Sequence, residues 1–154
     1  MRAFCARMGA TVPQRKALVL KASRILLSEK PLPERLQAFL EALLEGPFPI
    51  RSGKLYLRKG EGLRLVAQLG GEAGGEGVAL SLEGGGRALG RLSLRLAPAA
   101  SLAPEDRLAL EEAAGILALA LLRERAERAE RVLRRAGECA TQAAGEGDLL
   151  HKVC

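Results

Sequence analysis

The chain has 154 residues, which is enough for one domain with an extension, and 48% of them are hydrophobic while only 3% are aromatic. The net charge of +6 permits binding to nucleic acid or to anionic lipid but specifies neither. The longest apolar run, residues 113–122, is about half as long as a membrane span, and the first residues lack the apolar segment of a signal peptide, so we expect a cytoplasmic protein without a membrane partner.

Prolines divide the first third of the chain. Residues 1–13 are interpreted as a basic N-terminal arm. Apolar residues at helical spacing predict a helix over 14–28, which Pro31 and Pro33 end. A second helix is predicted over 34–45, where Gly46 and Pro47 form a typical helix stop.

The period of the apolar residues changes to two after Gly53. Residues 54–58, 63–69, 78–82 and 89–96 alternate between apolar and polar side chains, and the glycine-rich residues 70–77 separate the second run from the third. Alternation predicts an antiparallel sheet with one covered and one solvated face. The predicted fold class is therefore α+β, with a sheet of about four to five strands and with the N-terminal helices and a long C-terminal helix packed on one face.

A long helix is predicted from Pro104 to Ala136. Pro104 suits the first helical position, and Glu105 and Asp106 place negative charge at the positive end of the helix dipole. Residues 113–122 are all apolar or glycine, so this part of the helix must be covered on every side. We expect one face to pack on its own domain through Leu110, Ala114, Leu117 and Leu121.

The opposite face of this helix has the spacing of a coiled-coil seam. Its apolar residues recur in steps of three and four: Leu119, Leu122, Ala126, Ala129, Leu133 and Ala136. A helix over 104–135 would span roughly 50 Å, whereas a strand spans about 20 Å. We therefore expect a homodimer in which Leu119, Leu122, Ala126, Ala129 and Leu133 form the interface. A helix that docks only on its own domain is the other interpretation.

This pattern predicts four segments: a basic arm over 1–13, a domain over 14–123, a helical extension over 124–136 and a flexible tail over 137–154. In the extension, glutamates precede arginines by four residues, an order that stabilises a solvated helix surface. These pairs are Glu124–Arg128, Glu127–Arg131 and Glu130–Arg134.

The residues that could carry chemistry form no catalytic set. The single histidine, His151, lies in the predicted tail, so a serine or cysteine nucleophile lacks a base. His151 and Cys154 have the spacing of a ligand pair, but a structural metal needs about four ligands. The glycine clusters lack the Lys-Ser/Thr and helix of a phosphate-binding loop. We therefore expect no enzyme, no cofactor and no metal.

The three cysteines, Cys5, Cys139 and Cys154, are odd in number and far apart. This arrangement argues against a disulfide framework and favours a reducing compartment.

One stretch resembles the C-terminal half of a GAF domain. Gly90, Leu92 and Leu94 match the family's Gly-x-Leu-x-Leu strand, Pro104 to Asp106 match its helix start, and an apolar helix over 108–122 follows. The resemblance implies a regulatory domain that binds a small ligand or dimerises and passes a signal through its terminal helices.

Departures from the GAF pattern concern the ligand-binding half. Family members usually insert a long segment that roofs the ligand pocket, and residues 70–77, the one place for it here, are far too few. The Asn-Lys-Phe-Asp type motif of the cyclic-nucleotide branch is also absent. The resemblance therefore implies a minimal or truncated GAF-like domain that lacks the ligand-covering insert, and its cofactor-binding residues stay unknown.

The function hypothesis is a non-catalytic GAF-like module for signalling and dimerisation, which acts through its terminal helices on a separate output protein. The alternative is a nucleic-acid-binding accessory protein that uses the basic N-terminal region, whose cations are Arg2, Arg7, Arg15, Lys16, Lys21 and Arg24. That region contains no helix-turn-helix pattern and one aromatic side chain for stacking, Phe4. A solvated basic surface is the third interpretation.

Overall fold

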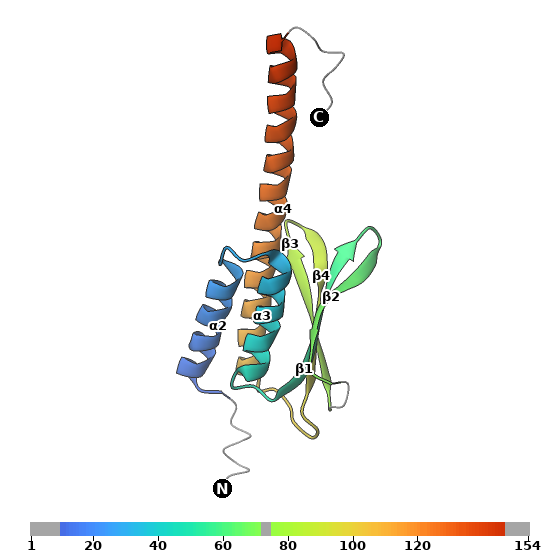
Figure 1. Cartoon of the computed structure of the whole chain (residues 1–154). Coiled ribbons are helices and arrows are strands. Elements are labelled where there is room, and N and C mark those ends of the chain that lie inside the picture. Colours follow the sequence, from blue (N-terminus) through green and yellow to red (C-terminus); the bar gives the residue numbers. More distant parts are fainter. Residues whose placement is uncertain (1–9, 72–74, 147–154) are drawn as a thin grey trace. The chain divides into compact units, whose positions relative to one another are not determined.

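The computed structural model describes residues 10–71 and 75–146 (Figure 1). The elements follow in the order α2 (Val12–Leu26), α3 (Leu32–Glu45), β1 (Ile50–Lys59), β2 (Gly62–Leu69), β3 (Gly77–Gly84), β4 (Arg87–Leu96) and α4 (Pro104–Glu146). The chain divides into two units, Met1–Ala120 and Leu121–Cys154, and α4 contributes to both. The fold class is α+β, as the sequence predicts.

The four strands form one antiparallel sheet in the order β2-β1-β4-β3. Strands β1 and β4 are the two central strands, and β1 pairs with β2 on one side and with β4 on the other. The first and the last strand of the sequence therefore lie side by side at the centre of the sheet. Residues 70–76 connect β2 to β3.

Helices cover one face of the sheet in the first unit (Figure 1). The core between them is mainly aliphatic and includes Phe39, which has no exposed area. Helix α3 approaches β1 closely because Gly53 has no side chain: a Cβ there would lie 3.2 Å from Leu40 and 3.1 Å from Leu94. The alternating burial of β3 and β4 follows from this arrangement, since one face of each strand packs on helices and the other meets solvent.

Helix α2 begins at Val12, two residues before the start that its apolar spacing predicts. Thr11 and Gln14 form a capping box in which the Gln14 N–H donates to Thr11 Oγ1 at 3.3 Å and the Thr11 N–H donates to Gln14 Oε1 at 2.8 Å. Pro13 is tolerated because it lies in the first turn, where its missing N–H is not needed. The prediction of an arm up to residue 13 overlooked this Thr-x-x-Gln signal.

Helix α4 extends to Glu146, beyond the end predicted at Ala136. Gly137 stands where the prediction ended the helix, but one glycine in a helix interior costs only about 1 kcal/mol and does not stop it. The remainder of the predicted tail, residues 147–154, lies outside the described residues, as do residues 1–9 of the predicted arm. In the described part of the chain, no helix is both long and apolar enough to cross a membrane.

Candidate functional site

The outer face of α2 and of the first part of α4 exposes large apolar side chains. The exposed fraction is 52% for Val12 and 57% for Leu20 on α2, and 63% for Leu108 and 66% for Leu119 on α4. Contiguous apolar surface of this kind on a folded domain typically marks an interaction site.

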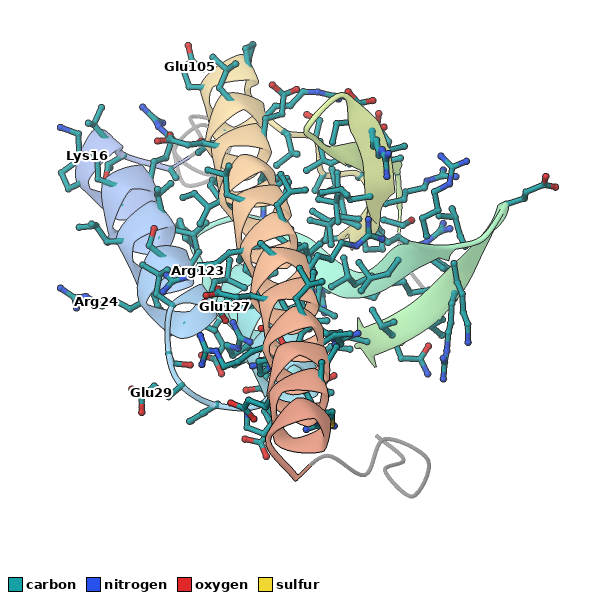
Figure 2. All side chains as sticks on the ribbon, turned by 90° about the horizontal axis from the view of Figure 1, so that it is seen from above. Lys16, Arg24, Glu29, Glu105, Arg123 and Glu127 are labelled. Atoms are coloured by element: carbon teal, nitrogen blue, oxygen red, sulfur yellow. The ribbon has the colours of Figure 1, made fainter. Side chains whose placement is uncertain are left out.

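A groove of about 510 Å³ lies between the two helices in the first unit. Its walls are mainly apolar, with charged residues among them: Val12, Arg15, Lys16, Val19 and Leu20 from α2, and Glu105, Leu108, Ala109 and Glu112 from α4. Figure 2 shows Lys16 on α2 and Glu105 at the start of α4 as two of these charged side chains. The groove therefore has a basic wall and an acidic wall.

The predicted inner and outer faces of α4 separate clearly by burial. Leu110, Ala114, Leu117 and Leu121, which were expected to pack on the chain's own domain, are all buried. Of the predicted dimer-interface residues, Leu119 is exposed in the first unit, Ala126, Ala129 and Leu133 are exposed in the second unit, and Leu122 is partly exposed. Leu108 and Gly115 lie on the same side of the helix before them and are exposed too, with the charged Glu112 between the two.

A buried ion pair fixes the start of α4 to the start of α2. Asp106 is only 2% exposed, and its carboxylate accepts a hydrogen bond from the Arg15 guanidinium at 3.3 Å. The Ala10 N–H donates to both carboxylate oxygens at 3.2 Å, and the same Arg15 nitrogen donates to the Ala10 carbonyl. The sequence alone relates Asp106 only to the helix dipole, because a pairing with residues so far away in the chain leaves no local pattern.

The charged surface of the second unit pairs partly as predicted. Glu130 contacts Arg134 at 3.3 Å, which is the expected pair. Glu127 contacts Arg123 at 2.9 Å instead of Arg131, and Arg131 lies 4.0 Å from Glu124. These are exposed helix-surface contacts of small energetic weight.

The remaining candidates are dispersed. Cys139 is disulfide-bonded, whereas the number and spacing of the cysteines argued against a disulfide framework. His151, Cys154 and Cys5 lie outside the described residues. No group of three His, Cys, Asp or Glu side chains that could hold a metal occurs within residues 10–71 and 75–146.

The basic N-terminal set is also divided. Arg2, Arg7 and Phe4 lie outside the described residues, Arg15 binds Asp106, and Lys21 lies 3.7 Å from Glu45. The nucleic-acid alternative stays a prediction.

Comparison with known proteins identifies the fold through solved structures. No protein-family model matches the chain, and no curated protein sequence matches it. The fRMsr structure of Staphylococcus aureus in its reduced form aligns with a TM-score of 0.61 at 13% identity, over 70% of this chain and 94% of that one. The GAF domain of a Pseudomonas syringae pv. tomato protein described as a sensor histidine kinase aligns with a TM-score of 0.63 at 20% identity, over 76% and 93%.

A third neighbour is the GAF domain of A. aeolicus nlh2 in an inactive state, with a TM-score of 0.58 at 12% identity, over 73% of this chain and 98% of that one. At these identities the likeness concerns the fold, and it extends over nearly the whole length of each neighbour.

The neighbours correct one expectation. The fRMsr protein is a free methionine-R-sulfoxide reductase, and a second structure of it was solved in complex with substrate, with a TM-score of 0.59. This finding contradicts the prediction that the chain is not an enzyme, because an enzyme has the same fold. The prediction rested on the absence of familiar catalytic residue sets from the sequence. Sensor GAF domains and an enzyme thus share the architecture, and the chain has a GAF-like fold.

Proposed function

We propose that the chain is a regulatory GAF-like module that forms a homodimer through the outer face of α2 and α4 and passes its state to a separate output protein. The observation that carries this proposal is the apolar groove between these helices, with Val12, Leu20 and Leu108 more than half exposed. The likeness to GAF domains, one of them from a protein described as a sensor histidine kinase, supports the regulatory role.

The energetics of the face favour a partner. Burying a large aliphatic side chain contributes about 1.5–3 kcal/mol, and a twofold interface would bury each of these side chains twice. An isologous contact also places the same surface on both sides, so it must complement itself.

The charges of the two helices support such a self-complementary contact. Arg15 and Asp106 pair with each other within the chain. Besides them, helix α2 carries Lys16, Lys21 and Arg24 and no acidic residue, whereas the first turns of α4 carry Glu105, Glu111 and Glu112 with Arg107. The basic helix of one copy would therefore meet the acidic helix of the other. Complementary charge of this kind orients association and excludes wrong partners.

Signal transmission would use the same helices. The stripe of α4 combines leucines with small residues, including Gly115, Ala126 and Ala129, which permits close helix approach. Shifts of about 1–2 Å between packed helices are a common way to couple a domain to its partner.

Cross-linking tests whether this face contacts its own copy. In a background with the three native cysteines changed to serine, we expect Leu119→Cys to yield a species of twice the 16.3 kDa chain with a short thiol cross-linker. Leu63→Cys on β2, where the native leucine is 51% exposed, is the matched control and should stay monomeric on denaturing gels. Equal cross-linking at both positions, or none at Leu119, would reject the proposed interface.

A further inference from the structure

The second face of the sheet, here called the open face, carries no helix in the first unit, since the helices cover the other one (Figure 1). Residues that alternate with the buried ones on β1 and β4 belong to this open face. The register pairs them across the two central strands, Ser52 with Arg95, Lys54 with Ser93 and Tyr56 with Arg91. Figure 2 shows nitrogen-ended side chains gathering on the side of the sheet away from the helices.

The open face is strongly basic. Alternation places one carboxylate on it among the described strand residues, that of Glu83 on the edge strand β3. Lys54 lies diagonally between Arg91 and Arg95, and diagonal neighbours on a sheet are about 7–8 Å apart, so like charges adjoin each other. Their repulsion costs stability, and a polyanion bound to the face would relieve it. The cations of the open face are Lys54, Arg58, Arg91 and Arg95.

Three of these cations are exposed arginines whose charge the described part of the chain does not neutralise. Within the described ranges, no carboxylate lies within 4 Å of the guanidinium groups of Arg58, Arg91 and Arg95. Arg58 donates to the Gly60 carbonyl at 3.2 Å and Arg95 to the Gly75 carbonyl at 3.3 Å, which uses one of the five N–H groups of each. The remaining N–H groups have the geometry that phosphate oxygens accept from.

An aromatic ring and two leucines lie among the cations. Tyr56 is half-buried at the middle of β1, and the register places Leu65 of β2 opposite it and Leu63 opposite Arg58. Leu63 and Leu65 are 51% and 42% exposed. An antiparallel sheet with an uncovered aromatic ring and flanking cations is a platform on which nucleic-acid bases stack.

We propose that the open face binds single-stranded nucleic acid. Phosphates of the strand would contact the four cations, and a base would stack on the Tyr56 ring beside Leu65. From Arg58 to the residue paired with Arg95, β1 advances six residues, or about 20 Å, which fits a strand of several nucleotides. The inference goes beyond the proposed function, because it uses a different surface from that of α2 and α4. It also differs from the sequence-based alternative, which uses the N-terminal region.

Fluorescence anisotropy of a labelled oligothymidylate, titrated with the full-length chain, tests the inference. An oligouridylate of the same length is titrated alongside, and saturable binding of either polymer supports the proposal. Neutralising four phosphates of a single strand predicts a log–log salt dependence with a slope of about −3, so the affinity should fall roughly fiftyfold between about 50 and 200 mM salt. No saturable binding of either polymer at low salt, up to about 100 μM chain, would overturn the proposal.

Matched charge variants separate the open face from the rest of the chain. We expect Arg58→Gln combined with Arg91→Gln to weaken binding about tenfold or more at low salt and to make the salt slope shallower by about 1.4, because two phosphate contacts are lost. Arg2→Gln combined with Arg7→Gln removes the same charge from the N-terminal region and should change the affinity less than about twofold. An equal or larger loss in this control would overturn the proposal.

A pair of variants at Tyr56 keeps every charge and provides a second reading if the arginine variant unfolds the sheet. We expect Tyr56→Leu to weaken binding about tenfold with an unchanged salt slope, because the stacking surface is lost. Tyr56→Phe retains the ring and should bind within about twofold of the native chain. Equal affinities of the two variants would overturn the proposal in favour of a surface for acidic proteins, which requires the charges but not the ring.

Poly-glutamate with the same number of charges serves as the competitor. It offers anionic groups without bases, so it should displace the labelled oligonucleotide only at much higher concentration than the unlabelled oligonucleotide does. Displacement at the same concentration would overturn the proposal. The cross-linking at Leu119 uses no nucleic acid, so a failure of the open face and a failure of the dimer can be told apart.

Discussion

Asp106 accepts hydrogen bonds from residues that are far away in the sequence, at the opposite end of the first unit's chain. It is buried at the start of α4, and all of its partners come from the start of α2 and the residue before its cap. A buried carboxylate is stable only when its oxygens are fully paired, and here both oxygens accept hydrogen bonds. The start of α4 and the start of α2 are therefore tied in one arrangement, at one end of the groove between them.

Removal of this carboxylate provides the prediction at the residue scale. We expect Asp106→Ala to lower the free energy of unfolding by about 2 kcal/mol, because it leaves the Ala10 N–H unsatisfied and Arg15 unpaired. The loss stays below that of a fully buried pair because Arg15 is 21% exposed and can reach water. Urea unfolding at fixed protein concentration measures it, with the exposed neighbour Glu105→Ala as control. Equal losses from the two substitutions would show that the buried contacts contribute nothing.

Helix boundaries show how far local sequence determines the elements. The strands were predictable within a few residues because the alternation of apolar side chains is strict, as in β3. The helix starts depended on capping chemistry: the box of Thr11 and Gln14 places α2 earlier than its apolar pattern alone would. The end of α4 was missed because its last turns have little apolar periodicity, although nothing in them breaks a helix strongly enough to end it.

The start of α4 carries the prediction at the element scale. The Ala103 carbonyl accepts the first helical hydrogen bond, from the Arg107 N–H at 3.0 Å, so alanine occupies the capping position. A serine there can accept from an otherwise unpaired N–H of the first turn, and we expect Ala103→Ser to raise the free energy of unfolding by about 1 kcal/mol. Ala100→Ser, outside the helix, should leave stability within about 0.5 kcal/mol. Thermal unfolding compares the two, and a destabilised Ala103→Ser would show that the cap geometry is not met.

At the scale of the whole molecule, sequence patterns predicted which helix faces are buried better than they predicted binding sites or catalysis. The inner face of α4 could be predicted since apolar periodicity reports directly on burial, and Leu110 and Leu117 have no exposed area. The groove between α2 and α4 could not be predicted, because it combines segments that are distant in the sequence. The prediction that the chain is not an enzyme failed for a related reason, because it considered only catalytic residue sets that a sequence shows directly.

Mass in solution tests the dimer most directly. Light scattering across a range of concentrations should give twice 16.3 kDa for the intact chain. We expect Leu119→Glu combined with Leu133→Glu to give a monomer, because each carboxylate would be buried in an apolar contact. Leu63→Glu combined with Leu65→Glu alters two leucines on β2 that are 51% and 42% exposed, and it should remain a dimer. An intact chain that stays monomeric at every concentration would contradict the account.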